Sequence, residues 1–151
     1  MTDSQVGSRF LVVDASVSLK WVLDDEADLE SSLALRNDGI EGRFQMLAPS
    51  LWLYEITNAL VVAHRRDRID RGQGPQALAL LQNLGVRLAD PEAEECFATA
   101  ARYEISAYDA AYLALAEAAQ TKLWTGDRKL YEKVSSKTEL IRWIGDYQPA
   151  G

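Results

Sequence analysis

The sequence predicts an α/β fold in which a mostly parallel sheet is covered by helices on both faces. Short apolar segments alternate with longer segments of helical character along the chain, which is the pattern of strands joined by helices. Phe10–Val13 is the clearest strand, because four apolar residues run without interruption and are followed by Asp14. A short apolar segment that stops at turn-forming residues is typical of a strand buried on both faces.

Length and composition indicate one globular domain. The 151 residues suit a single core, and we expect a loose amino terminus at 1–9, the domain at 10–147 and a tail at 148–151. The net charge of −7 argues against loose nucleic-acid binding through a basic surface, but it allows a nuclease in which cations face the phosphates. Cys96 is the only cysteine and no apolar segment approaches ~20 residues, so we expect a cytoplasmic protein without a membrane span.

The first half of the chain predicts two strands and three helices. Asn37-Asp38-Gly39 is expected to end the second helix, Pro49 to stop the second strand, and Ser50 to cap the long third helix. The third helix is apolar on almost every side, which predicts that it is buried or packs a second face against a partner. The expected elements are strand 10–13, helices 16–23 and 24–36, strand 44–48 and helix 51–66.

The second half of the chain continues the alternation. Pro75 and Pro91 are expected to open helices, because proline is accepted in the first helical turn. Ser106 and Asp127 are expected to cap helices, because their side chains accept hydrogen bonds from free helix N–H groups. The expected elements are helix 75–84, strand 86–89, helices 92–103 and 107–120, strand 122–125, helix 128–134 and strand 139–144.

Acidic residues follow two of the expected strands. Asp14 comes directly after the first strand, and Asp127 comes shortly after 122–125. Right-handed crossovers place the carboxyl ends of parallel strands at one edge of the sheet, which is where ligands bind in open α/β folds. The two carboxylates should therefore lie at the same edge. Helix capping is the alternative explanation for each of them.

Two further acids lie within expected helices. Glu55 sits inside the apolar helix without a cationic neighbour one turn away, so it should be neutral, paired at long range or bound to a metal, unless its face is exposed. Asn58 shares its stripe and is a candidate to hold Glu55 or a water in place. Asp109 follows Ser106 in a capping-box pattern, yet it lies on the stripe of its helix that should face the core.

Together these acids predict a divalent-metal site. Clustered carboxylates repel one another and need cations, and an all-oxygen ligand set suits Mg²⁺ or Mn²⁺ better than zinc. Such ions activate water and stabilise leaving oxygens in phosphodiester hydrolysis. His64 is the only histidine and sits beside two arginines, so a zinc site or a Ser-His-Asp triad is not supported.

Four segments, in order and spacing, resemble the motifs of PIN-domain proteins. They are Val-Val-Asp-Ala-Ser-Val, Tyr-Glu-Ile-Thr-Asn-Ala-Leu, Ser-Ala-Tyr-Asp-Ala-Ala-Tyr-Leu-Ala-Leu-Ala and Trp-Thr-Gly-Asp-Arg-Lys-Leu. The likeness is greatest to the VapC-like toxin ribonucleases of toxin–antitoxin pairs. It implies a three-layer α/β/α sandwich and an Mg²⁺- or Mn²⁺-dependent endoribonuclease.

The resemblance also assigns residues and partners. It places the four family acids at Asp14, Glu55, Asp109 and Asp127, with Asp14 and Asp109 as metal ligands. Small hydroxyl positions near the metal fall at Ser16 and Thr125. RNA is the implied substrate and a small antitoxin the implied partner, and the surplus apolar surface of the 51–63 helix predicts a homodimer.

Two other classes of function remain open from the sequence. The scaffold would also serve a binding module that keeps its acids without useful activity. A receiver-like or phosphatase-like Mg²⁺ domain ranks lower, because Asp14 has no acidic neighbour and position 16 is Ser rather than the second acid of an Asp-x-Asp motif.

Overall fold

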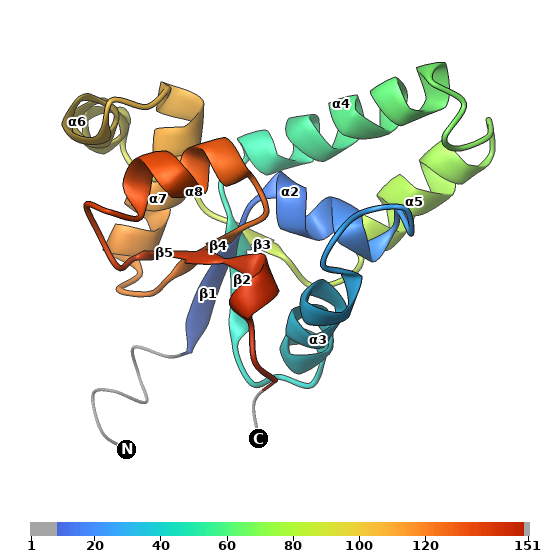
Figure 1. Ribbon diagram of the computed structural model, residues 1–151, viewed down its shortest axis with the longest axis horizontal. Coiled ribbons are helices and arrows are strands. Elements are labelled where there is room, and N and C mark those ends of the chain that lie inside the picture. Colours follow the sequence, from blue (N-terminus) through green and yellow to red (C-terminus); the bar gives the residue numbers. More distant parts are fainter. Residues whose placement is uncertain (1–8, 150–151) are drawn as a thin grey trace.

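The predicted α/β fold is confirmed in a computed structural model, which describes residues 9–149 (Figure 1). Residues 1–8 and 150–151 of the expected loose terminus and tail lie outside this range. The elements in chain order are β1 (Phe10–Val13), α2 (Ala15–Ser18), the 3-10 helix η1 (Leu19–Trp21), α3 (Leu29–Ile40), β2 (Gln45–Ala48), α4 (Leu51–Arg65), α5 (Gln73–Gln82), β3 (Arg87–Leu88), α6 (Ala93–Tyr103), α7 (Ala107–Ala118), β4 (Leu123–Thr125), α8 (Arg128–Val134), β5 (Ile141–Trp143) and the 3-10 helix η2 (Ile144–Asp146).

The sheet has the strand order β3-β2-β1-β4-β5, and each neighbouring pair is parallel. The chain moves outward from β1 to β2 and β3, returns to β4 on the other side of β1, and then continues to β5. The direction of winding therefore reverses between β1 and β4, which makes the carboxyl ends of these two strands the topological switch point of the sheet.

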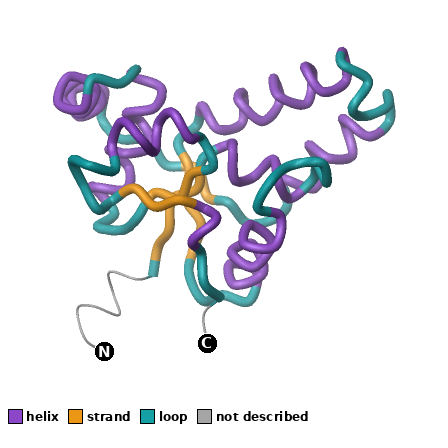
Figure 2. Tube along the Cα trace, viewed as in Figure 1, coloured by secondary structure: helices purple, strands orange, loops and turns teal. Residues whose placement is uncertain are grey.

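Helices lie on both sides of the sheet, as the three-layer prediction requires (Figures 1 and 2). The helices α2 to α5, which connect β1, β2 and β3, lie on one side, and α6, α7 and α8 lie on the other, whereas η2 after β5 packs against α3. This division follows from right-handed crossovers, because connections that run in opposite directions along a sheet must pass over opposite faces. The α4 and α5 helices extend beyond the sheet as a packed pair.

The core is centred on β1. Val12 and Val13 are fully inaccessible to solvent, as is Leu123 on the neighbouring β4, which explains the uninterrupted apolar sequence of the first strand. Ile56 of α4 and Leu113 of α7 are buried in the same apolar cluster. The central strand is therefore held from both sides, and this fixes the position of the residue that follows it, Asp14.

Two sequence predictions about helix ends are wrong. The helix expected at 24–36 is α3, which begins later and continues through Asn37-Asp38-Gly39 to Ile40. Asp38 is buried within α3 and accepts a hydrogen bond of 2.6 Å from the Tyr147 hydroxyl, a contact that outweighs the turn-forming character of the local sequence. Ser50 does not cap α4 with its side chain; its backbone N–H and its hydroxyl both donate to Asp90, at 2.7 and 2.5 Å.

The α4 helix buries one face rather than its whole surface. Trp52, Ile56 and Leu60 are in the core, whereas Tyr54 is 76% exposed and Val61 38% exposed. The helix is thus apolar on a side that this chain leaves open.

Within residues 9–149, no helix is both long and apolar enough to cross a membrane.

Candidate active site

Asp14 is the most deeply placed acid of the predicted site. It follows β1 directly and its side chain is 6% exposed. One carboxylate oxygen, Oδ1, accepts hydrogen bonds from the Ser16 hydroxyl at 2.5 Å and from the Val17 backbone N–H at 3.2 Å. The other oxygen, Oδ2, accepts a hydrogen bond from the Thr125 hydroxyl at 2.5 Å. Both oxygens of the carboxylate are therefore held in place by groups from β4 and from the first turn of α2.

Ser16 and Thr125 are themselves fixed by the backbone that follows β4. The Gly126 N–H donates to the Ser16 hydroxyl oxygen at 2.7 Å, and the Asp127 N–H donates to the Thr125 hydroxyl oxygen at 3.0 Å. Ser16 and Thr125, which the sequence predicted to support the site, thus join the carboxyl ends of β1 and β4. The network therefore lies at the topological switch point of the sheet.

Burial raises the pKa of Asp14 from an ordinary value of 3.8 to about 6. The loss of hydration is the largest cause, and the nearby charge of Asp127 acts in the same direction. The hydrogen bonds from Ser16, Thr125 and Val17 lower the pKa, but they do not offset the cost of removing the charged form from water. A cation bound at this site would therefore offset the free-energy cost of burying the charged Asp14 carboxylate.

Glu55 and Asp109 bring further negative charge to the same edge. Glu55 is half-buried on α4, and Asp109 is half-buried in the first turn of α7. Burial is the largest cause of a raised pKa for each group, and the charge of Asp127 raises the pKa of both as well. Asp127 thus acts on Asp14, Glu55 and Asp109, so the fold brings all four predicted acids within electrostatic reach of one another.

The helix-capping alternative is also realised in the structure. Asp14 accepts from the Val17 N–H, and Asp127 accepts from the Leu130 N–H at 3.2 Å. Ser106 accepts from the Asp109 N–H at 3.0 Å, and its hydroxyl lowers the pKa of the Asp109 carboxyl. Capping and participation in an acidic site do not exclude each other, because a cap uses only one or two of the acceptor positions of a carboxylate.

Asn58 does not take the supporting position that the sequence suggested. It is exposed on α4, and no hydrogen bond joins it to Glu55 within the described part of the chain. The partner of Glu55 is Tyr112, whose hydroxyl donates to Glu55 Oε1 at 2.5 Å. Sequence reasoning missed this bond, because the two residues are 57 positions apart.

The acids fit Mg²⁺ or Mn²⁺ as a pair of ligands rather than as a closed cage. Among residues 9–149, no three His, Cys, Asp or Glu side chains are gathered closely enough to hold a metal ion. Mg²⁺ does not require such a cage, because it keeps several water ligands and is commonly bound by one or two carboxylates. Asp14 and Asp109 offer the oxygen donors that Mg²⁺ prefers, and their pKa values are raised mainly by burial and further by the charge of Asp127, both of which a cation would offset.

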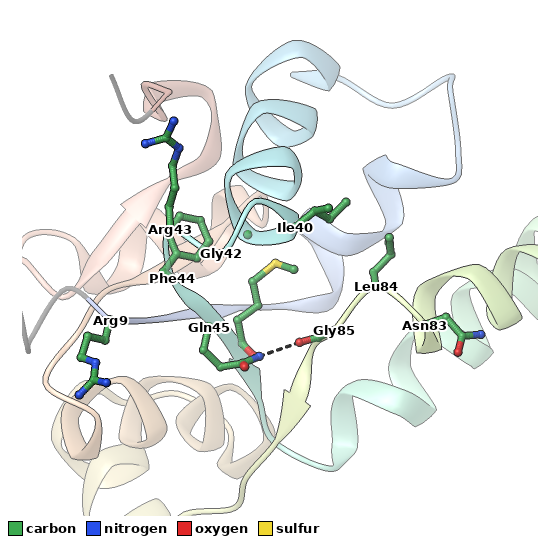
Figure 3. Close-up of a pocket in the computed structure, with 11 residues that line it drawn as sticks. Arg9, Ile40, Gly42, Arg43, Phe44, Gln45, Asn83, Leu84 and Gly85 are labelled. Atoms are coloured by element: carbon green, nitrogen blue, oxygen red, sulfur yellow. Dashed lines mark hydrogen bonds between the residues drawn. The ribbon is translucent and has the colours of Figure 1, made fainter.

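A hollow of about 600 Å³ lies at the opposite edge of the sheet (Figure 3). It is lined by the residues that precede β1, β2 and β3, among them Arg9, Phe44 and Gly85. The Gln45 side-chain amide donates to the Gly85 carbonyl at 2.7 Å and ties β2 to the segment before β3. None of the four predicted acids lines this hollow, so it is separate from the acidic site.

The fold and the acidic edge define a class of α/β domains with carboxylates at the switch point of a parallel sheet. The family model of the PIN domain matches residues 11–135, and the chain belongs to that family. It is 31% identical over 127 residues to Ribonuclease VapC3 from Pyrobaculum aerophilum, covering 82% of this chain and 93% of the relative. The crystal structure of PAE2754 from Pyrobaculum aerophilum is also similar, with a TM-score of 0.68 and 27% identity, covering 93% of this chain and 92% of that chain. The resemblance that the sequence motifs indicated is thereby confirmed.

We expect Asp14→Asn to stabilise the metal-free protein at neutral pH and to have less effect in acid. The folded-state pKa of about 6 lies above the ordinary value of 3.8, so wild-type stability is lost as the pH rises from about 4 to 6. Asn removes the buried charge and is an equally good N-cap, although it cannot accept from both Ser16 and Thr125. The net gain should be about 1 kcal/mol.

Urea unfolding of both proteins in chelator, at pH 4.5 and at pH 7.5, measures this effect. The difference in unfolding free energy should grow with pH. A variant that is less stable than wild type at pH 7.5 would show that the hydrogen-bond network, not the buried charge, dominates at this position.

Proposed function

We propose that this protein is a divalent-metal-dependent endoribonuclease that acts as the toxin of a toxin–antitoxin pair. Membership of the PIN-domain family and the similarity to a protein named as a ribonuclease support ribonuclease activity. The observation that carries the proposal is that Asp127 acts electrostatically on Asp14, Glu55 and Asp109, with Asp14 and Asp127 following the strands of the switch point. A strong charge cluster with no histidine or thiolate suits metal-assisted phosphodiester hydrolysis.

Asp14 and Asp109 are the proposed ligands of Mg²⁺ or Mn²⁺. Once bound, the ion would lower the pKa of a water and balance the charge that develops on the phosphate. Ser16 and Thr125 each donate to a different oxygen of Asp14, which keeps this carboxylate in one orientation. Such hydrogen bonds around a ligand keep it placed and raise metal affinity.

Glu55 is the proposed acceptor of the proton from the attacking water. Its pKa is raised by burial, which makes it a better base than an ordinary exposed carboxylate. Asp127 is the exposed N-cap residue of α8, and its backbone N–H donates to Thr125; its proposed role is to orient water at the outer side of the site. These roles assign one function to each of the four acids.

We expect the purified protein to cleave RNA in Mg²⁺ or Mn²⁺ and to stop when the metal is chelated. Asp109→Asn should abolish cleavage, because it removes a ligand charge while preserving the shape of the side chain. The folded structure should persist, since the helix cap at this position is made by Ser106 and the Asp109 backbone N–H. Gel analysis of defined RNAs, with circular dichroism of each protein, measures both properties.

Asp70→Asn is the matched control for this substitution. Asp70 accepts from the Gly72 and Gln73 N–H groups at the start of α5, and it is exposed and remote from the switch point. The control variant should cleave like wild type. Cleavage that survives chelation, or full activity in Asp109→Asn, would contradict the metal mechanism. RNA binding without any cleavage would favour the non-catalytic binding module instead.

The proposed partners are a small antitoxin and a second copy of the chain. The open apolar side of α4, with Tyr54 and Val61 exposed, supports a symmetric dimer that covers it. The acidic site suits an inhibitor that presents an arginine, because a guanidinium binds carboxylates through paired hydrogen bonds and would displace the metal. We also propose the cytoplasm as the site of action, which agrees with a single unpaired cysteine.

Light scattering should give twice the mass of the chain at tens of micromolar. Tyr54→Arg should shift the mass toward the monomer, because it places a charge on the proposed contact, whereas Phe97→Arg on α6 removes a similarly exposed aromatic elsewhere. A monomeric wild type would rule out the dimer. If an adjacent gene encodes the proposed antitoxin, co-expression with it should relieve growth inhibition, and failure of the two proteins to co-purify would favour general RNA processing.

A further inference from the structure

Tyr112 is a buried tyrosine whose hydroxyl lies among the acids of the site. It is on α7, one turn after Asp109, and only 2% of its surface is exposed. Its hydroxyl donates to Glu55 Oε1 at 2.5 Å. Because Glu55 belongs to α4, this bond links two helices that approach the sheet edge from different parts of the chain.

The same hydroxyl also meets the end of β1. The backbone of Ala15, which directly follows Asp14, lies close enough to lower the pKa of the Tyr112 hydroxyl. Burial and the Glu55 carboxylate raise that pKa more strongly, so the hydroxyl stays protonated and keeps its hydrogen for Glu55. The Tyr112 hydroxyl therefore bonds α7 to α4 at a point close to the residue that follows Asp14.

The Tyr112 hydrogen bond restricts the conformation of the Glu55 side chain but occupies only one of its two carboxylate oxygens. Glu55 has several rotatable bonds, and no lysine, arginine or histidine forms an ion pair with it in the described part of the chain. Left alone, it would be driven away from Asp109 and Asp127 by like charge, because both raise its pKa. Tyr112 holds Oε1 and leaves Oε2 available to the site.

We propose that Tyr112 is a positioning residue that fixes Glu55 relative to Asp14 and Asp109 and so sets the affinity of the site for a divalent cation. The inference rests on the proposed metal-dependent function. It extends that function to a residue outside the four acids, which acts on the metal through Glu55. Loss of a hydrogen bond that supports a metal ligand lowers metal affinity by roughly 10- to 100-fold in other proteins, and because Glu55 acts beside the ligands as a neighbouring charge, we expect the lower end of that range.

Tyr147 provides a matched control. It is also a buried tyrosine that donates to a carboxylate, at 2.6 Å to Asp38. Asp38 is near the end of α3, which leads into β2, so this pair lies toward the edge of the sheet opposite the acids. Replacing either tyrosine with Phe keeps the ring and removes one hydroxyl, so both variants should lose similar stability.

The experiment titrates MnCl₂ into wild type, Tyr112→Phe and Tyr147→Phe by isothermal calorimetry, without RNA. Tyr112→Phe should bind Mn²⁺ about tenfold more weakly, and Tyr147→Phe should bind like wild type. Melting temperatures in chelator should fall to a similar extent in the two variants. In the cleavage assay, excess Mn²⁺ should restore most of the activity of Tyr112→Phe, because its acids are intact.

Glu55→Asp supplies a second test, measured alone if Tyr112→Phe proves too unstable and otherwise also in combination with it. It keeps the charge but shortens the side chain beyond reach of the Tyr112 hydroxyl, and its loss of Mn²⁺ affinity should not add to that of Tyr112→Phe. Wild-type affinity in Tyr112→Phe, equal losses in both Phe variants, or additive losses would overturn the positioning role alone. A wild type that binds no Mn²⁺ would overturn both this inference and the proposed metal mechanism.

Discussion

The burial of the Asp14 carboxylate is the constraint on which the arrangement of the site depends. An acid at the end of the central strand has lost its water, and its hydrogen bonds from Ser16, Thr125 and the α2 backbone do not restore its ordinary pKa. Those same bonds draw the ends of β1 and β4 together through Gly126 and Asp127. The geometry that makes the acid costly to ionise therefore also assembles the place where a cation would stabilise it.

Sheet topology explains why the remaining acids gather near Asp14. The chain winds outward on one side of β1 and then returns to its other side. The segments that follow β1 and β4 therefore diverge at the carboxyl ends of these two strands. The α4 and α7 helices approach this point from opposite layers and bring Glu55 and Asp109 with them. The Tyr112 hydroxyl joins the two layers there. Family membership, fold and charge distribution thus support the same functional edge.

The parts of the structure that depend on local patterns could be predicted from the sequence. The apolar segment at β1 and the acids after β1 and β4 could be assigned because strand ends and helix caps have local signatures. Errors arose where a distant residue decided the outcome. Asp90, 40 positions away, binds the Ser50 hydroxyl that was expected to cap α4. Tyr147 hydrogen-bonds Asp38 inside α3, and Tyr112 rather than Asn58 is the hydrogen-bond partner of Glu55. No local pattern in the sequence encodes these contacts.

The proposed function requires that the carboxyl edge of β1 and β4 binds a divalent cation. The most direct measurement is a crystal structure of the metal-free protein soaked in MnCl₂, with data collected to reveal the anomalous scattering of manganese. The account predicts an anomalous peak in coordination distance of the Asp14 and Asp109 carboxylates, with the Tyr112–Glu55 hydrogen bond retained. A well-ordered structure whose manganese lies only elsewhere, or that shows no manganese at these carboxylates, would contradict the account.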